Sequence, residues 1–390
     1  MDGNLILGEG TLPKIRSNSP PGGWFPALQD YHWWIAERNI PYADLFLSPH
    51  LKKVWVSLTY ASSRVSCNLL PAIASTISSL PTSALQLVFI DLTLDDVPRT
   101  YFKDSLSSVA LRCGSSLTEF SSETPLSDEA VNHLIQLPNL RIIYIGSPPP
   151  NYSTSSLPLV FSPLADLTLG KDAVHGWLSL FERLENRVPT TQDVTPLFKL
   201  KESLKSLSVE HPPGLTIDHS FTSSIQIYRN LVDLNAMVCC REGPGSQCTF
   251  KSDNDNITEL AMALPRLKSL VFGYPCSGNT CATTVACLLP ISVHCLRLEK
   301  LSIHFNTTNV VDGFKNLSED PRFQVLRSLP RCILWCLQIH RIPLNFDEPG
   351  SETVINGIAD LFPSLRLIEG FERIWKWEDL SGRVAELRET

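Results

Sequence analysis

The clearest copy of a motif that recurs along this chain is Leu264-Pro265-Arg266-Leu267-Lys268-Ser269-Leu270-Val271-Phe272. A Pro or Ser is followed by Leu, two variable residues, an apolar residue, one variable residue and a second apolar residue. The alternation of apolar and variable positions is the pattern of a short β-strand with one buried face. Such a strand cannot bury its apolar side chains alone, so the motif predicts that neighbouring copies stack on one another.

Copies of this motif follow one another along most of the sequence. Their first leucines lie 23 to 40 residues apart, and a period of roughly 20–50 residues indicates a stacked repeat array. The copies at Leu85, Leu117 and Leu334 are weaker than the others. The anchor leucines are Leu28, Leu51, Leu85, Leu117, Leu140, Leu164, Leu204, Leu231, Leu267, Leu298, Leu334 and Leu365.

Helical stretches separate the copies. Asp128–Leu137 has apolar residues at helical spacing, and Ser127 or Asp128 can cap its first turn. Asn256–Leu264 and Thr353–Phe362 repeat this design, each with Pro just past its end. We therefore predict an α/β fold, an irregular leucine-rich-repeat solenoid of about 11–12 units, with short parallel strands on the concave face and helices on the convex face. The alternative is a doubly wound α/β sheet, which would show longer buried strands and Gly-rich turns.

Two segments are expected to differ from the repeats. Residues 1–23 are predicted to be a flexible N-terminal segment, because Ser17–Gly23 is rich in Ser, Pro and Gly. Residues 24–390 are predicted to form a single solenoid. A C-terminal capping helix is expected at about 375–388, where it would cover the apolar edge of the last repeat. Its apolar face would consist of Trp375, Trp377, Leu380, Val384 and Leu387.

Composition limits the compartment and the classes of partner. The net charge is −7 and no basic run is present, which argues against nucleic acid as a partner. No apolar run reaches the 18 residues of a membrane span, and the first ten residues lack the pattern of a secretory signal. The 11 cysteines are therefore expected to be reduced thiols. We predict a cytoplasmic or nuclear protein with neither membrane nor nucleic-acid partners.

Metal and catalytic motifs are not recognisable in the sequence. Six cysteines gather within a short stretch, but a structural zinc site usually needs two closely spaced pairs, and a second such pair is missing. Buried or loop thiols are thus expected, with zinc as the alternative. These cysteines are Cys239, Cys240, Cys248, Cys276, Cys281 and Cys287. No Gly-x-Ser-x-Gly or phosphate-binding loop occurs. We expect no catalytic residue, cofactor or metal, and an enzyme without a recognisable motif is a further alternative.

The variable positions inside the strands should project from the concave face and contact a partner. They are aromatic near the N-terminus and small and polar in the middle, which suits a protein or peptide partner. A merely solvated surface is the alternative. The candidate residues are Asp30, His32, Lys53, Trp55, Tyr144, Asp166, Ser206, Ser208, Asp233, Asn235, Ser269, Lys300, Ser302 and His304, with Ile142 and Thr168 at equivalent positions.

Tryptophan is enriched at interfaces. Trp33, Trp34, Trp55 and Trp177 are therefore either interface anchors or large residues of the core and the ends of the array.

Several stretches are similar to one protein family. The chain resembles basidiomycete-fungal F-box proteins, whose C-terminal regions are leucine-rich-repeat-like, and the resemblance covers nearly all residues from Trp24 onward. It is carried by Trp24–Leu28, Leu45–Leu51, Leu260–Leu267, Leu288–Leu296, Leu301–Asn306 and Ile358–Leu365 followed by Trp375.

The resemblance implies a substrate-recognition subunit of a ubiquitin ligase. In that family, an N-terminal F-box of about three helices docks on the adaptor of a cullin ligase, and the repeats present a substrate. An F-box is not recognisable in the first 23 residues. A cullin-ligase adaptor is therefore expected as a partner only if an F-box is missing from this gene model. The alternative function is a free-standing interaction scaffold that is not coupled to a ligase.

Overall fold

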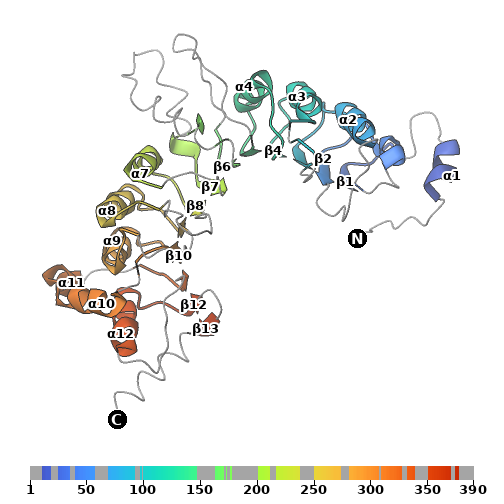
Figure 1. Cartoon of the computed structure of the whole chain (residues 1–390). Helices are drawn as coiled ribbons and strands as arrows, with labels where there is room; N and C mark the ends of the chain where they lie inside the picture. Colours follow the sequence, from blue (N-terminus) through green and yellow to red (C-terminus); the bar gives the residue numbers. More distant parts are fainter. Residues whose placement is uncertain are drawn as a thin grey trace, which may run out of the picture. The chain divides into compact units, whose positions relative to one another are not determined.

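The structure is a computed structural model of the chain (Figure 1). Its contacts divide the chain into two compact units, which are described separately. Unit 1 comprises residues 1–173 and 189–200, and unit 2 comprises residues 174–188 and 201–390. The structure describes residues 11–18, 25–35, 40–57, 69–92, 97–98, 100–146, 163–170, 173, 176–177, 201–210, 217–237, 250–273, 281–306, 309–326, 332–338, 350–369 and 374–376.

The strands of unit 1 form a sheet in which every neighbouring pair is parallel. These strands are β1 (Asp30–Trp34), β2 (Lys53–Ser57), β3 (Leu87–Asp91), β4 (Glu119–Ser122), β5 (Ile142–Ile145) and β6 (Asp166–Leu169). The helices are α1 (Thr11–Ser17), the 3-10 helix η1 (Ile40–Phe46), α2 (Leu70–Ser78), α3 (Lys103–Arg112) and α4 (Asp128–Gln136). Helices α2, α3 and α4 lie beside one another on one side of the strands (Figure 1).

Unit 2 repeats this arrangement. Its parallel strands are β7 (Ser206–Glu210), β8 (Asp233–Met237), β9 (Ser269–Phe272), β10 (Lys300–Ile303), β11 (Cys336–Gln338) and β12 (Leu367–Glu369), and β13 (Ile374–Lys376) pairs antiparallel with β12. Its helices are α7 (His219–Gln226), α8 (Asn254–Ala263), η3 (Val285–Cys287), α9 (Leu288–His294), α10 (Val310–Glu319), α11 (Pro321–Leu326) and α12 (Ser351–Leu361). Helices α7, α8 and α9 again lie side by side.

The anchor leucines set the register of every strand from β1 to β12. Each strand begins two residues after its anchor: β2 follows Leu51 and β9 follows Leu267. The anchors are buried, apart from Leu28, which is half-buried. Side chains then alternate along the strands, as in β3, where Val88 and Ile90 are fully buried. The prediction of an α/β leucine-rich-repeat solenoid is confirmed, and the described residues contain twelve such strands.

Successive repeats are joined by a recurring pair of hydrogen bonds. Within each unit, the carbonyl of the residue after an anchor accepts the N–H groups of two consecutive residues in the next repeat. Gln29 O accepts from Lys52 and Lys53, and Lys52 O accepts from Gln86 and Leu87. The same bonds recur through both units, with N···O distances of 2.6–3.2 Å. The backbone polar groups at the start of each strand are thereby satisfied by the neighbouring repeat.

Side-chain caps start several of the helices. Ser127 Oγ accepts a hydrogen bond from the N–H of Ala130 at 3.2 Å, which confirms Ser127 as the cap of α4. Asp253 and Asn256 form a reciprocal capping box at the start of α8. These caps satisfy orphan N–H groups at the helix ends.

Each end of the chain contains an element that the sequence pattern does not predict. Helix α1 lies in the segment predicted to be flexible, and Arg16 fixes it to η1: the guanidinium bonds to Asp44 at 3.1 Å and to Pro41 O, and lies over the Tyr42 ring. The predicted capping helix cannot begin at about residue 375, because Ile374–Lys376 is strand β13, whose backbone pairs with β12. Residues 377–388 lie outside the described residues.

The extent of the repeat array stays a prediction, because 24–390 as one solenoid spans both compact units.

In the part of the chain that the structure describes, none of the helices is long and apolar enough to cross a membrane.

Candidate functional site

The strand positions that alternate with the buried ones form rows across the sheet of unit 1, on the face opposite its helices. We call this surface the open face. Its first row contains the first residue of each strand, and its second row contains the third residue. The first row is Asp30, Lys53, Leu87, Glu119, Ile142 and Asp166, and the second row is His32, Trp55, Phe89, Ser121, Tyr144 and Thr168. All of these side chains are exposed or half-buried.

Aromatic rings stack along the second row. The rings of Trp55 and Phe89 are 3.9 Å apart between centroids with an interplanar angle of 20°, and the His32 ring stacks on Trp55 at 5.9 Å. The strand register brings these three residues together, because His32 pairs with Trp55 and Trp55 pairs with Phe89. Stacked rings hold one another in place, so this row presents a pre-ordered apolar surface.

The other end of the open face is acidic with an apolar centre. Ile142 is 38% exposed, and its register partners are Glu119 and Asp166. Burial raises the pKa of Glu119, and the nearby Asp166 carboxylate raises it further. In the first row, Asp30 pairs with Lys53 at 3.7 Å. No ion pair joins Glu119 or Asp166 to a Lys or Arg of the described part of the chain.

The sequence pattern predicts most of the open face but misses Phe89, which forms its closest ring stack with Trp55. Phe89, with Leu87, Glu119 and Ser121, lies on the two weak motif copies and was not among the candidates. Counting two and four residues from the anchors Leu85 and Leu117 would have found all four, because this offset holds in every other strand.

The equivalent surface of unit 2 is more polar and less exposed. Asp233 and Lys300 are exposed, whereas Ser206, Ser208, Asn235 and Ser269 are half-buried. The Lys300 ammonium lies 5.3 Å from the centroid of the Trp335 ring. This surface lacks the ring stack of unit 1 among the residues that the structure describes.

Two predicted surface residues of unit 2 are buried. Ser302 is 2% exposed and His304 is 6% exposed, so the prediction that they project toward a partner is wrong. Ser302 is small and lies between Val271 and Gln338 of the adjacent strands. His304 follows the end of β10 and packs edge-on against Phe250, with ring centroids 6.1 Å apart.

The tryptophans divide between the core and the open face. Trp33 and Trp177 are 4% and 2% exposed, so they are core residues, whereas Trp55 is half-exposed. The side chain of Trp34 lies outside the described part of the structure.

The predicted thiol cluster is described only in part. Cys281 and Cys287 are buried, and the Cys281 thiol lies 3.8 Å from His304 O. Cys239, Cys240, Cys248 and Cys276 lie outside the described residues. Among the residues that are described, no three His, Cys, Asp or Glu side chains gather as metal ligands do.

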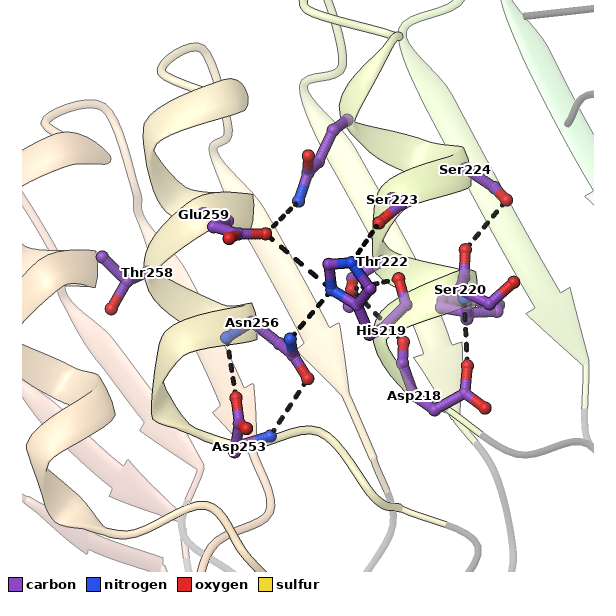
Figure 2. A network of polar contacts seen from close by, with 12 residues as sticks. Asp218, His219, Ser220, Thr222, Ser223, Ser224, Asp253, Asn256, Thr258 and Glu259 are labelled. Atoms are coloured by element: carbon purple, nitrogen blue, oxygen red, sulfur yellow. Dashed lines mark hydrogen bonds and ion pairs between the residues drawn. The ribbon is translucent and has the colours of Figure 1, made fainter. Parts of the chain in front are cut away.

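A polar cluster joins α7 and α8 on the helix side of unit 2 (Figure 2). His219 Nε2 is 3.3 Å from Ser223 Oγ, and His219 Nδ1 is 3.9 Å from Glu259 Oε2 and 3.1 Å from Asn256 Nδ2. A serine, a histidine and a carboxylate in this order are the residue types of a hydrolase triad, so the proton positions decide whether the cluster resembles one in function.

The capping box at the start of α8 fixes the orientation of the Asn256 amide, which faces the His219 ring. The N–H of Asp253 donates to Asn256 Oδ1 at 3.4 Å, so the Asn256 amide turns its NH₂ group toward His219 (Figure 2). In this arrangement Nδ1 is placed to accept from Asn256, and the tautomer that fits carries its N–H on Nε2, directed at Ser223. A general base must instead accept the serine proton at Nε2. The contacts of the cluster link α7 to α8.

Comparison with solved structures gives distant similarities, two of which are described below. No family model matches the chain, and no curated protein sequence matches it. The crystal structure of the Rad7 and Elc1 complex in yeast is similar at 13% identity and a TM-score of 0.38, over 88% of this chain and 76% of that chain. A leucine-rich-repeat protein of Leptospira interrogans is similar at 14% identity and a TM-score of 0.32, over 92% of this chain and 74% of that chain. Similarities this distant carry no argument about function.

Proposed function

We propose that this chain is a non-catalytic protein-recognition module and that the open face of unit 1 is its binding surface. The observation that carries the proposal is the stacked row His32, Trp55 and Phe89. Binding energy concentrates at aromatic anchors that are already rigid, because little side-chain entropy is lost when a partner covers them. The exposed Ile142 extends the apolar surface along the same face.

A selection experiment tests this proposal. A random dodecapeptide library is displayed and selected against the immobilised full-length chain, and the selected peptides are measured by calorimetry against the wild type and Trp55→Ser. We expect Kd to rise by at least about tenfold for Trp55→Ser, the loss expected of a central aromatic anchor. Tyr101→Ser is the matched control, since Tyr101 is a 43% exposed aromatic residue outside the strands. Equal binding to Trp55→Ser and wild type would overturn the proposal, as would a library that yields no binder.

The finer proposal is that the recognised protein is the substrate of a ubiquitin ligase. It is supported by the resemblance to F-box proteins carried by Trp24–Leu28, Leu260–Leu267 and the other stretches quoted above. The full-length chain is mixed with purified cullin-ligase adaptor proteins and analysed by size-exclusion chromatography. A stable complex supports ligase coupling. Separate elution shows that this chain does not bind the adaptor by itself, which favours the free-standing interaction scaffold.

A further inference from the structure

Two carboxylates flank an exposed apolar residue on the open face. Glu119, Ile142 and Asp166 are the first residues of β4, β5 and β6, and they are direct register partners. Adjacent strands are about 4.8 Å apart, so the two carboxylates lie on one row about 10 Å from each other with Ile142 between them. An extended side chain that lies over Ile142 can therefore reach both.

The negative charges of Glu119 and Asp166 have no cation to pair with among the other residues of the first row. The remaining carboxylate of the row, Asp30, has its cation in Lys53 at 3.7 Å. The net charge of the chain is −7. Burial raises the pKa of Glu119, and the repulsion of the Asp166 carboxylate raises it further. A guanidinium or ammonium group placed between Glu119 and Asp166 would relieve this repulsion, so charge complementarity requires a basic residue in the occupant.

The distance from the acidic pair to the ring stack sets the spacing in the occupant. The midpoint of Trp55 and Phe89 lies about two and a half strand spacings from β5, or about 12 Å, and two residues further along the strands, or about 7 Å. The diagonal is about 14 Å, which an extended chain spans with about four residues. Residues four apart in an extended segment also point to the same side.

We infer that the partner is a protein segment that crosses the strands in extended conformation, with Arg or Lys between Glu119 and Asp166 and an aromatic residue four positions away on the Trp55–Phe89 stack. This inference rests on the proposed function, and it adds the chemistry and the spacing of the recognised segment. The basic residue supplies selectivity, and the aromatic residue supplies contact area.

A series of designed peptides tests the inference. Fluorescein-labelled dodecapeptides carry one Arg and one Trp in a Gly/Ser background, separated by one to seven positions and in both orders, and their binding to the full-length chain is measured by fluorescence anisotropy. We expect the lowest Kd at a separation of four, with separations of three and five weaker by about fivefold or more, because their side chains point to opposite sides. Raising the salt concentration should weaken the best peptide.

A double-mutant cycle assigns the basic contact. The combined variant Glu119→Gln and Asp166→Asn should weaken the best Arg peptide by about tenfold, but should leave the matching norleucine peptide within about twofold. The control is Asp104→Asn with Glu129→Gln, which removes the same charge from exposed positions on α3 and α4. This control should bind the Arg peptide as the wild type does.

The outcomes separate the inference from the proposed function. If library-selected peptides depend on Trp55 but lack the Arg–aromatic spacing, or bind the Gln/Asn variant as tightly as the wild type, the inference is wrong and the proposed function stands. If no peptide of either kind depends on Trp55, both are wrong. A flat dependence of Kd on the Arg–Trp separation likewise overturns the inference.

Discussion

Gly146 and Gly170 directly follow β5 and β6, where successive repeats approach most closely. The Gly146 N–H donates to Ser122 O at 2.9 Å. A Cβ on Gly146 would lie 2.1 Å from Glu123 O, and a Cβ on Gly170 would lie 2.9 Å from the Cα of Gly146. Both contacts are with backbone, which cannot rotate away, so these positions require a residue without a side chain.

Substitution of Gly146 should therefore destabilise unit 1. We expect Gly146→Ala to lower the free energy of unfolding by about 2–4 kcal/mol, because the clash forces backbone movement in two repeats. Gly114→Ala is the matched control, since a Cβ there meets no atom within 4 Å, and it should be neutral or slightly stabilising. Urea unfolding followed by circular dichroism measures both. Equal stabilities of the two variants would contradict the close approach at Gly146.

Glu119 gives a prediction about pH. Burial and the nearby Asp166 carboxylate raise the pKa of Glu119 in the folded chain above its ordinary value, so the folded state binds the proton more tightly than the unfolded state. The contribution of this group to stability is present below the unfolded pKa and is lost as pH rises through the folded pKa. Glu119→Gln should consequently raise the Tm, relative to wild type, more at pH 7 than at pH 4.

Calorimetric melts at the two pH values check this sign. Glu129→Gln is the control, because Glu129 is in the first turn of α4, where a negative charge stabilises the helix N-terminus, and its loss should slightly lower the Tm at pH 7. A Glu119→Gln variant that is less stable than wild type at pH 7 but equal to it at pH 4 would show that the carboxylate is stabilised in the fold.

The sequence pattern predicts which strand residues point to the side opposite the helices. It does not predict which of those residues neighbouring repeats will bury. Period-2 alternation places Trp55 and Tyr144 on this face, because it depends only on the strand register. The burial of Ser302 and His304 depends on neighbours from other repeats, Val271 and Phe250, and the pattern of one strand contains no information about them.

At the scale of elements, the anchor leucines predict where strands begin, whereas the element at the C-terminal end of the sheet has no anchor to predict it. An anchor leucine is fixed by the stack, so every strand from β1 to β12 starts two residues after one. Strand β13 has no anchor and exists through its antiparallel pairing with β12. The helical spacing of Trp377, Leu380, Val384 and Leu387 suggests a helix that begins near residue 375. The backbone of Ile374–Lys376 pairs with β12 instead.

Strand β9 offers a test of the register. Leu267 and Leu270 are 0% and 2% exposed, so Leu267→Asp with Leu270→Asp would bury two charges in the stack and should abolish the cooperative melt of unit 2. Ser269→Asp is the control, because Ser269 lies on the opposite side of β9 in register with Lys300, and it should melt within a few degrees of wild type. A double variant with an unchanged circular-dichroism melt would show the register to be wrong.

At the scale of the whole molecule, cysteines are distributed through both cores. Burial raises the pKa of Cys113, Cys295 and Cys332 to about 12 each. A thiol reacts as the thiolate, so these three should resist alkylation in the native chain. Two of these thiols also contact the preceding repeat: Cys295 Sγ lies 3.7 Å from Ala261 O, and Cys332 Sγ lies 3.2 Å from Leu298 O.

Alkylation therefore reports folding of each unit. Iodoacetamide at pH 8, mapped by mass spectrometry, should label Cys113, Cys295 and Cys332 at least about a hundredfold more slowly in buffer than in 6 M guanidinium, since opening of the stack is needed for access. The comparison of Cys113 in unit 1 with Cys295 in unit 2 also shows whether the units open together. Rapid labelling of any of the three in the native chain would contradict its burial.

The paired hydrogen bonds between repeats have a consequence for how such a chain can evolve. Within a unit, one carbonyl of a repeat accepts two N–H groups of the next repeat. The carbonyl oxygens of Gln29, Thr118 and Lys268 all do so in the same way. The same pair of hydrogen bonds forms whatever the length of the segment on the helix side, because it occurs at anchor spacings from 23 to 36 residues. An in-frame duplication or deletion of one repeat therefore preserves every type of junction, and lineages can lengthen or shorten the array while the open face diversifies independently of its framework.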